Sequence, residues 1–308
     1  MPENPLAAGV DVGGTSIKCV LTAPDGRIVA GLRSPTPRRG ADIGERLTDA
    51  IATCVATLSE QAPGPVSAVG LAVPGVVADA DGLAMRSENL GWSDLPLRDM
   101  VAERLSLPTA FGHDVRVGGL AEARLGSGRT LRSVVFVPIG TGIAAALILD
   151  GRPYSAGGYA GEIGHTDVGH GEPCVCGATG CLEAIASAAA IARRYTRRSG
   201  RPVAGAEEVV ALAGAGDSSA LTTWNEALDA LAGALAWVAS VLAPEAVILG
   251  GGLAEAGDAL MTPVAERLTA NLSFQRRPRL LRAALGDRAA SLGSALLAHE
   301  LLAETCAR

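Results

Sequence analysis

The chain has 308 residues, of which 48% are hydrophobic and only 3% aromatic, and its formal net charge is −6. This composition supplies a large core of small side chains and excludes an intrinsically disordered chain. The acidic balance, with no basic run longer than a pair of arginines, argues against nucleic acid or an anionic membrane as the partner. The length is comfortable for two domains.

No segment of the sequence predicts membrane insertion or export. The longest uncharged apolar stretch, Ala230–Ala243, is shorter than the roughly 20 residues that span a bilayer. Residues Met1–Leu6 contain no basic segment followed by an apolar run, so they do not resemble a secretory signal. We therefore expect a soluble cytoplasmic α/β protein.

The first part of the chain predicts an antiparallel meander followed by alternating helices and strands. Turn residues at Asp11–Ser16 and Pro24–Gly26 separate three short apolar runs, as between adjacent strands. Val76–Val77 is expected to resume the strand that Pro74-Gly75 stops. The expected strands are Ala7–Val10, Ile17–Leu21, Arg27–Leu32, Val66–Val73 and Thr109–His113, and the expected helices are 43–58, Leu95–Leu105 and Val115–Leu125.

The second part repeats this pattern of strands, a Gly-Thr turn and helices, which predicts a duplicated α/β architecture. We place a domain boundary near His113–Asp114, giving a small domain 1–113, joined by the last helix at about 290–308, and a large domain 114–289. The expected strands are Ser133–Pro138, Ile143–Leu149 and Ala246–Leu249, and the expected helices are Leu182–Tyr195, Ala206–Ala213, Leu221–Leu242, Asp258–Leu272 and Arg288–Leu302.

Three glycine-rich turns are candidates for binding an anion. In Asp11-Val-Gly-Gly-Thr-Ser, Gly13 and Gly14 permit close backbone approach, Thr15 adds donors, and Asp11 offers an oxygen ligand to Mg²⁺. The other two turns are Gly140-Thr-Gly142 and Gly250-Gly251-Gly252. The simpler explanation of the first turn is a β-hairpin, and that of Gly250-Gly251-Gly252 is a bend from a strand to a helix.

Asp114 follows the strand Thr109–His113 and precedes a helix, which allows two interpretations. Aspartate is among the best N-cap residues, with a contribution of about 1 kcal/mol. Ligands of open α/β sheets also collect at the carboxyl ends of strands, so Asp114 is a candidate catalytic carboxylate. The two roles are compatible.

One histidine and three clustered cysteines predict a metal site. His165, Cys174, Cys176 and Cys181 supply one imidazole and three thiolates, the donor set of a closed structural Zn²⁺ site. His170 is a rival fourth ligand, and the scattered Cys19, Cys54 and Cys306 are expected in the core or as incidental residues. Folding this loop around a metal is expected to bring Glu162, His165 and Glu183 to one wall of a cleft.

Taken together, these motifs resemble the ROK family of repressors, open reading frames and sugar kinases, over residues 7 to about 297. The resemblance implies a two-domain, actin-like ATPase (ribonuclease H-like) fold that binds sugar and ATP in the interdomain cleft, and a homodimer or dimer of dimers. It rests on Asp11-Val-Gly-Gly-Thr, Gly161-Glu-Ile-Gly-His165, Cys174-Val-Cys-Gly-Ala-Thr-Gly-Cys181-Leu-Glu183 and Ile248-Leu-Gly-Gly-Gly252.

The resemblance also implies a role for each matching residue. Asp114 would be the catalytic base, and Glu162, His165 and Glu183 would hold sugar hydroxyls. His165 would use its other ring nitrogen for Zn²⁺. Asp11 would face the nucleotide's Mg²⁺, the phosphates would lie beside Gly13, Gly14, Thr15, Thr141 and Gly142, and the adenosine beside Gly251 and Gly252.

Three positions depart from the family pattern. His113 stands where most members have Asn before the catalytic Asp, and it is the candidate contact to the far side of the sugar ring. Lys18 lies three residues after Thr15 rather than directly after it, which puts a phosphate role in doubt. The spacing from His165 to Cys174 is one residue shorter than expected.

The leading prediction is ATP-dependent phosphorylation of a hexose 6-hydroxyl, with glucose as the substrate. The alternatives are a kinase of an amino sugar, such as 3-amino-3-deoxyglucose (kanosamine) or an N-acylhexosamine, and a kinase that uses polyphosphate. A sugar-responsive repressor is disfavoured because only ten residues precede Asp11 and no basic recognition helix is present.

Overall fold

The structure, a computed structural model, describes residues 5–306, and the side chain of Cys306 lies outside the described part, as does most of Met1–Leu6. It divides into two compact units. The first unit contains the chain up to Ala121, Ser155–Ala160 and the chain from Asp287; the second contains Glu122–Tyr154 and Gly161–Gly286. The two units divide between Ala121 and Glu122, within helix α3 (Asp114–Arg124). This point lies later in the chain than the boundary expected at 113/114, because most of α3 packs with the first unit. The last helix belongs to the first unit.

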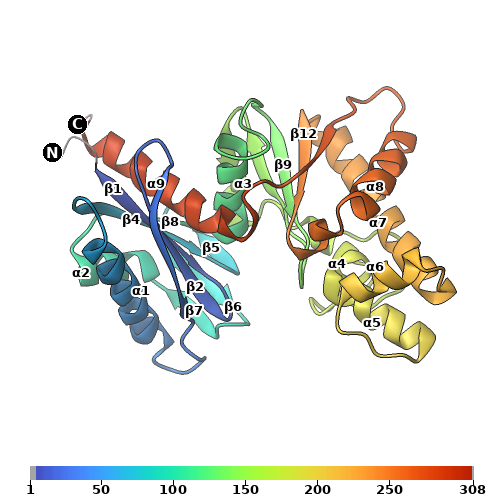
Figure 1. Cartoon of the computed structure of the whole chain (residues 1–308), viewed down its shortest axis with the longest axis horizontal. Helices are drawn as coiled ribbons and strands as arrows, with labels where there is room; N and C mark the ends of the chain where they lie inside the picture. Colours follow the sequence, from blue (N-terminus) through green and yellow to red (C-terminus); the bar gives the residue numbers. More distant parts are fainter. Residues whose placement is uncertain (1–4, 307–308) are drawn as a thin grey trace. The chain divides into compact units, whose positions relative to one another are not determined.

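The first unit is built on a five-stranded sheet of order β3-β2-β1-β4-β8 (Figure 1). The antiparallel pairs β1–β2 and β2–β3 confirm the expected meander, and β4 and β8 extend the sheet in parallel with β1. Its elements are β1 (Leu6–Val12), β2 (Ser16–Thr22), β3 (Ile28–Pro35), α1 (Ile43–Glu60), β4 (Val66–Val73), α2 (Leu97–Leu105), β8 (Thr109–His113), α3 and α9 (Ala289–Cys306).

Alternate residues of this sheet serve two different layers. Val10 and Leu71 join the cluster formed with α1 and α2, whereas their neighbours Gly9 and Gly70 face α9, because successive side chains of a strand point to opposite faces. A Cβ on Gly70 would lie 1.8 Å from the carbonyl oxygen of Ser294. The two glycines therefore let the small-residue face of α9 lie directly on the strands.

A small antiparallel sheet in the first unit was not expected from the sequence. It contains β5 (Val76–Ala78), β6 (Leu83–Ser87) and β7 (Trp92–Leu95). The prediction that Val76–Val77 resumes the preceding strand is wrong, because Gly75 has a φ of +97° and turns the chain away. A Cβ at Gly75 would lie 2.2 Å from the carbonyl oxygen of Arg86 in β6, so only glycine fits at this position, directly before β5.

The second unit has a five-stranded sheet of order β11-β10-β9-β12-β13 and a helical layer. Val135, Val137, Val247 and Leu249 of its central strands pack against helices α4 to α8 in one core. Its elements are β9 (Val134–Pro138), β10 (Ala146–Leu149), β11 (Arg152–Tyr154), α4 (Leu182–Ala186), α5 (Ala188–Ser199), α6 (Ala206–Gly214), α7 (Ser218–Leu242), β12 (Ala246–Gly250), α8 (Asp258–Ala270) and β13 (Arg279–Arg282).

The helix expected over Leu182–Tyr195 is two helices, α4 and α5. They are separated by Ser187, which has an extended conformation (φ −68°, ψ 154°) and accepts a hydrogen bond from the amide of Ala190. Serine in this role is a good N-cap, so α5 begins as a new helix with Ser187 alone between it and α4. The expected strand Ile143–Leu149 begins only at Ala146, and the short strands β11 and β13 were not expected.

Helix α7 is long and apolar enough by length and composition to cross a membrane, but half of its most apolar window is buried. Trp224, Leu228, Leu231 and Leu235 of this helix belong to the core of the second unit. The core helix of a soluble protein meets the same criteria, and packing accounts for the apolar character of α7.

The contact between α9 and the first sheet yields a test. Gly70→Ala should destabilise the protein by about 1–3 kcal/mol or more, because the new methyl group meets backbone rather than a movable side chain. Chemical denaturation measures the change. Gly64→Ala is the control, since no atom lies within 4 Å of a Cβ built there. Equal stabilities for the two variants would contradict the close packing of α9.

Candidate active site

The loop between β1 and β2 is a tight hairpin with one unexplained glycine. The Gly13 amide donates to the Ser16 carbonyl oxygen at 3.0 Å, and Thr36 Oγ1 donates to the Gly13 carbonyl oxygen at 2.7 Å. Gly14 has no positive φ, and a Cβ there would have no neighbour within 4 Å. The hairpin accounts for the position of Gly13, but neither strain nor packing requires glycine at 14. Open space beside backbone amides suits an anion.

Asp11 lies buried at the carboxyl end of β1, beside Ala72 of β4. Its Oδ2 is 3.5 Å from Lys18 Nζ, and Lys18 also donates to the Asp287 carbonyl oxygen at 3.0 Å. Burial is the main cause that raises the pKa of Asp11 to about 6; the negative charge of Asp114 adds to it and Lys18 opposes it. Lys18 is thus the partner of Asp11, a role that its spacing from Thr15 did not suggest.

His113 is the last residue of β8, and Asp114 begins α3. Asp114 Oδ1 accepts a hydrogen bond from the Val115 amide at 2.7 Å and lies 3.3 Å from His113 Nδ1. An N-cap side chain usually accepts a hydrogen bond from the second or third amide of the helix. Asp114 accepts one from the adjacent residue instead, so helix capping does not explain why an aspartate occupies this position. Burial raises the pKa of Asp114 to about 6, against the Val115 amide and the charges of Arg116 and Lys18.

Sequence reasoning missed a buried ion pair next to Asp114. Arg116 is 4% exposed, and its Nε and Nη2 each lie 3.1 Å from a carboxylate oxygen of Asp79. Its Nη1 donates to the Gly158 carbonyl oxygen at 3.2 Å. An arginine within the otherwise small and apolar segment Val115–Leu120 was the available signal. The pair fixes the first turn of α3 and thereby the backbone that carries Asp114.

In the second unit, the segment Gly161–His165 lies directly against the backbone of Ile143–Ala145, which leads into β10. A Cβ on Gly161 or Gly164 would lie 2.0 Å from the carbonyl oxygen of Ala145 or Ile143, respectively. The Ala145 amide donates to the Gly161 carbonyl oxygen at 2.7 Å. Because glycine occupies the inner positions, the intervening Glu162 and the terminal His165 are exposed.

Glu183, in the first turn of α4, contacts the second glycine turn. Its Oε2 accepts a hydrogen bond from the Ile143 amide at 2.9 Å, and a Cβ on Gly142 would lie 2.5 Å from the same oxygen. Thr141, between the two glycines, is exposed. The structure therefore brings Glu183 and Thr141-Gly142 together, which the sequence left as separate sites.

The four expected metal ligands converge. One donor atom from each of His165, Cys174, Cys176 and Cys181 lies within 4.8 Å of all the others. Cys176 Sγ to Cys181 Sγ and Cys174 Sγ to His165 Nδ1 are both 3.7 Å. A tetrahedral Zn²⁺ with Zn–S bonds of about 2.3 Å places sulfurs about 3.8 Å apart, so the geometry fits the ion. His170, the rival ligand, is not part of this group within the described residues, and Cys19 and Cys54 are buried as expected.

The third glycine turn borders a pocket of about 240 Å³. Gly251 has a φ of +74°, and a Cβ there would lie 2.4 Å from the Ile139 carbonyl oxygen, so local structure requires glycine. Gly252 has open space instead. The sequence did not identify the other residues of the pocket, which is lined by Ala188, Gly205, Ala206, Glu207, Val210, Gly252, Leu253, Glu255 and Ala256.

Each unit thus carries its own set of expected site residues. Asp11, the Gly13–Thr15 turn, His113 and Asp114 belong to the first unit; Thr141, Gly142, Glu162, Glu183, Gly251, Gly252 and the four metal ligands belong to the second. In the first unit, the charges of Asp11 and Asp114 interact directly. A buried carboxylate with a raised pKa is a common feature of catalytic sites.

The raised pKa of Asp114 has a consequence for stability. The native state holds this proton up to about pH 6, whereas the unfolded chain releases it near 3.8, so the stabilising contribution is lost as pH rises between these values. Asp114→Asn should therefore be more stable than the wild type by roughly 1–2 kcal/mol above pH 7, and by little near pH 4. Denaturation at both pH values, with the exposed Asp81→Asn as control, measures the difference. If the difference in unfolding free energy between the two proteins is the same at both pH values, the pKa of Asp114 is not raised in the native state.

Comparison with known proteins gives the family. Residues 7–301 match the ROK family. A glucokinase of Halalkalibacterium halodurans is 33% identical over 280 residues, covering 85% of this chain and 84% of that protein.

Two solved structures are similar over nearly the whole chain. The ROK hexokinase of Thermus thermophilus has a TM-score of 0.87 and 32% identity, covering 97% of this chain and 99% of the other. A ROK family glucokinase from Streptomyces griseus, in complex with glucose and AMPPNP, has a TM-score of 0.81 and 30% identity, covering 96% and 99%. The fold is the two-domain actin-like ATPase fold, and the chain belongs to the ROK family.

Proposed function

We propose that this protein is an ATP-dependent sugar kinase that phosphorylates the 6-hydroxyl of a hexose, with glucose as the principal substrate. The observation that carries the proposal is Asp114, a part-buried carboxylate with a raised pKa at the carboxyl end of β8. Similar proteins are named glucokinase, and one of them was crystallised with glucose and AMPPNP. A base for the sugar hydroxyl is what such a reaction requires of the protein.

Phosphoryl transfer depends mainly on positioning and on stabilising charge. Asp114 accepts the proton of the 6-hydroxyl as the sugar oxygen bonds to the γ-phosphorus, the bond from this phosphorus to the β,γ-bridging oxygen breaks, and ADP leaves. The amides of Gly14 and Thr15 donate to phosphate oxygens, Gly13, whose own amide closes the hairpin on Ser16, lets the phosphates approach the backbone, and Thr141-Gly142 provides a second set of donors. Asp11 would hold a Mg²⁺ ion, directly or through water, and the bound ion would supply positive charge to neutralise the phosphates.

The nucleotide base and ribose are assigned to the pocket beside Gly252. Its alanine, valine and leucine side chains offer the apolar walls that a planar base needs, and small-molecule sites are mostly apolar with a few polar groups. The open space at Gly252 leaves room for the backbone to approach the adenosine.

Sugar recognition is assigned to Glu162, His165, Glu183 and His113. Glu183 directs Oε2 to the Ile143 amide, which leaves its other oxygen for a hydroxyl. His165 directs Nδ1 toward Cys174, which leaves Nε2 for the sugar. We infer that Zn²⁺ is the metal held by His165 and the three cysteines, and that it fixes this imidazole without taking part in the chemistry.

We further propose a cytoplasmic homodimer, or a dimer of dimers. On α7, Trp237 and Val241 lie one turn apart and are 72% and 76% exposed. Large apolar side chains exposed together on a helix are typical of an interface, and a second copy of the chain is the occupant that the resemblance implies.

The proposed reaction is tested by ADP release with glucose, mannose and N-acetylated or amino hexoses, with ATP or polyphosphate as the donor. Asp114→Asn should reduce turnover by about 10²–10⁴ while the protein stays folded. The wild-type kcat/KM should fall below about pH 6, as Asp114 becomes protonated. Near-normal turnover in D114N would rule out Asp114 as the base.

The metal proposal is tested by elemental analysis, which should give about one zinc per chain. Cys176→Ser should lose zinc, sugar affinity and thermal stability together, because metal binding energy is also folding energy for this loop. Cys54→Ser, outside the loop and buried in the first unit, is the control for zinc content and sugar affinity, both of which should stay at the wild-type level. Full activity of a verified zinc-free preparation would refute the structural role of the ion.

His113 supports amino sugars as a second substrate class. The carboxylate 3.3 Å from Nδ1 favours the neutral tautomer that carries its proton there, which leaves Nε2 as an acceptor. Such an acceptor takes a hydrogen bond from a hydroxyl or from an ammonium group at carbon 3, as in 3-amino-3-deoxyglucose.

His113→Asn should therefore shift the ratio of kcat/KM between glucose and 3-amino-3-deoxyglucose by at least about tenfold, or about 1.4 kcal/mol. The ratio between glucose and sugars that differ only at carbon 2 serves as the internal control and should change little. If the carbon-3 ratio is unchanged, His113 does not contact the sugar.

A further inference from the structure

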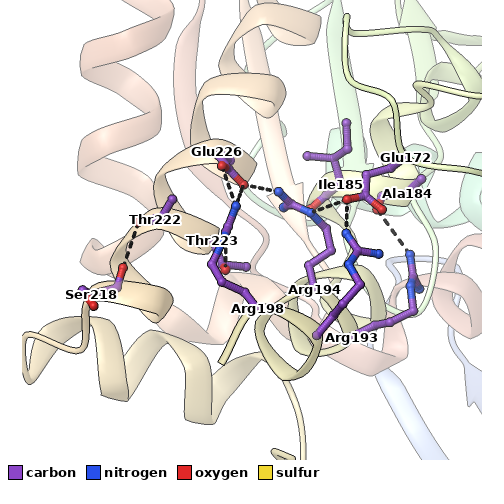
Figure 2. A network of polar contacts seen from close by, with 11 residues as sticks. Glu172, Ala184, Ile185, Arg193, Arg194, Arg198, Ser218, Thr222, Thr223 and Glu226 are labelled. Carbon is purple, nitrogen blue, oxygen red and sulfur yellow. Dashed lines mark hydrogen bonds and ion pairs between the residues drawn. The ribbon is translucent and has the colours of Figure 1, made fainter. Parts of the chain in front are cut away.

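Helix α5 contains two pairs of arginines, Arg193-Arg194 and Arg197-Arg198, that the sequence analysis did not assign to any site. Figure 2 shows that this helix meets α4, α7 and the loop before α4 through a network of polar contacts. Arg194 lies at the centre of the network and is 4% exposed. A buried guanidinium is costly unless it is paired and hydrogen-bonded, so its partners define its role.

Arg194 touches three elements of the second unit. Its Nη1 donates to the Ile185 carbonyl oxygen at 3.2 Å, its Nη2 pairs with Glu226 of α7, and its Nε lies 3.6 Å from Glu172 Oε1. Arg197 also pairs with Glu172. Glu172 therefore receives two arginines of α5, while its chain neighbours belong to the metal-binding loop.

Glu172 lies at the base of the cysteine loop, residues 166–181. Its carbonyl oxygen accepts a hydrogen bond from the Gly180 amide at 2.8 Å, and the next residue, Pro173, bridges to Thr179. These contacts close the part of the loop that contains Cys174 and Cys176. The carboxylate of Glu172 thus ties the closed loop to the body of the second unit.

Two arginines of α5 also donate hydrogen bonds to backbone carbonyl groups of α4, the helix that carries Glu183. Helix α4 has only five residues, and the last carbonyl groups of a helix have no partners within it. Arg193 donates to the Ala184 carbonyl oxygen at 3.3 Å, and Arg194 to that of Ile185. Both therefore stabilise the short helix whose first turn carries Glu183.

We propose that Arg194 is a positioning residue for the sugar: by joining Glu172 of the cysteine loop to the end of α4, it fixes His165 and Glu183 relative to each other. This inference rests on the proposed function of these two residues as sugar ligands. Arg194 touches neither sugar nor metal ligand and acts through Glu172 and the Ile185 carbonyl group.

The test compares Arg194→Gln with Arg198→Gln. Within the described part of the chain, Arg198 hydrogen-bonds to Thr223 and Glu226 of α7, so its loss removes a pair to the same glutamate but leaves the loop and α4 untouched. We expect Arg194→Gln to raise the glucose KM at least tenfold, with the ATP KM within about twofold. Arg194→Lys should recover part of the affinity, and Arg198→Gln should leave the glucose KM within about twofold.

Two further variants keep Arg194 in place and so avoid the risk that Arg194→Gln misfolds. Glu172→Gln and Arg197→Gln weaken the tether of the loop and should raise the glucose KM about three- to tenfold. Equal glucose KM values for the Arg194, Glu172 and Arg198 variants would overturn the proposal.

A second readout does not depend on the kinase activity. Hydrogen exchange at the amides of Gly180 and Leu182, which close the loop against Glu172 and Thr166, should become at least tenfold faster in Arg194→Gln but not in Arg198→Gln. If the wild type phosphorylates no hexose, the proposed function fails, and this comparison still decides whether Arg194 orders the loop. Unchanged exchange in the Arg194 variant would overturn the inference.

Discussion

The candidate active site depends on a partly buried carboxylate at the end of a strand. Asp114 follows β8 directly and keeps a raised pKa, although the Val115 amide and two cationic side chains favour its ionised form. Burial therefore dominates over these contacts, and a group in that state is a better proton acceptor than an ordinary aspartate. Burial of an ionised Asp114 is unfavourable. The close packing of small residues of α9 on the sheet and the Arg116–Asp79 ion pair stabilise the surrounding backbone.

Glycine has two different uses in this protein. At Gly70, Gly75, Gly161 and Gly251, a side chain would meet backbone atoms, so these glycines let elements of the fold approach one another. At Gly14 and Gly252 the structure leaves open space, and no positive φ demands glycine. The fold does not require glycine at these two positions, and the proposed close approach of phosphate and adenosine to the backbone accounts for it.

The sequence predicted the large elements because they carry strong periodic signals. The meander, α1 and the strand before Asp114 follow from apolar runs and turn residues, and the cysteine spacing indicated the metal group before any geometry was known. The short strands β6, β7, β11 and β13 were not predicted, and Val76–Val77 of β5 was assigned to the preceding strand. Polar residues and proline interrupt those four segments, whereas the equally short β9 and β12 are continuous apolar runs. The roles of Lys18, Arg116 and Arg194 depend on partners that lie far along the chain, such as Asp287, Gly158 and Glu172, and only tertiary structure reveals them.

The central claim is that Asp114 is the base for the sugar 6-hydroxyl. A crystal structure of the protein with glucose and a non-hydrolysable ATP analogue tests it most directly. The account predicts that the 6-hydroxyl oxygen lies within hydrogen-bonding distance of an Asp114 carboxylate oxygen, roughly 2.6–3.2 Å, with the γ-phosphate analogue on its other side. A 6-hydroxyl that faces another side chain, with Asp114 more than about 5 Å away and no water between them, would contradict it.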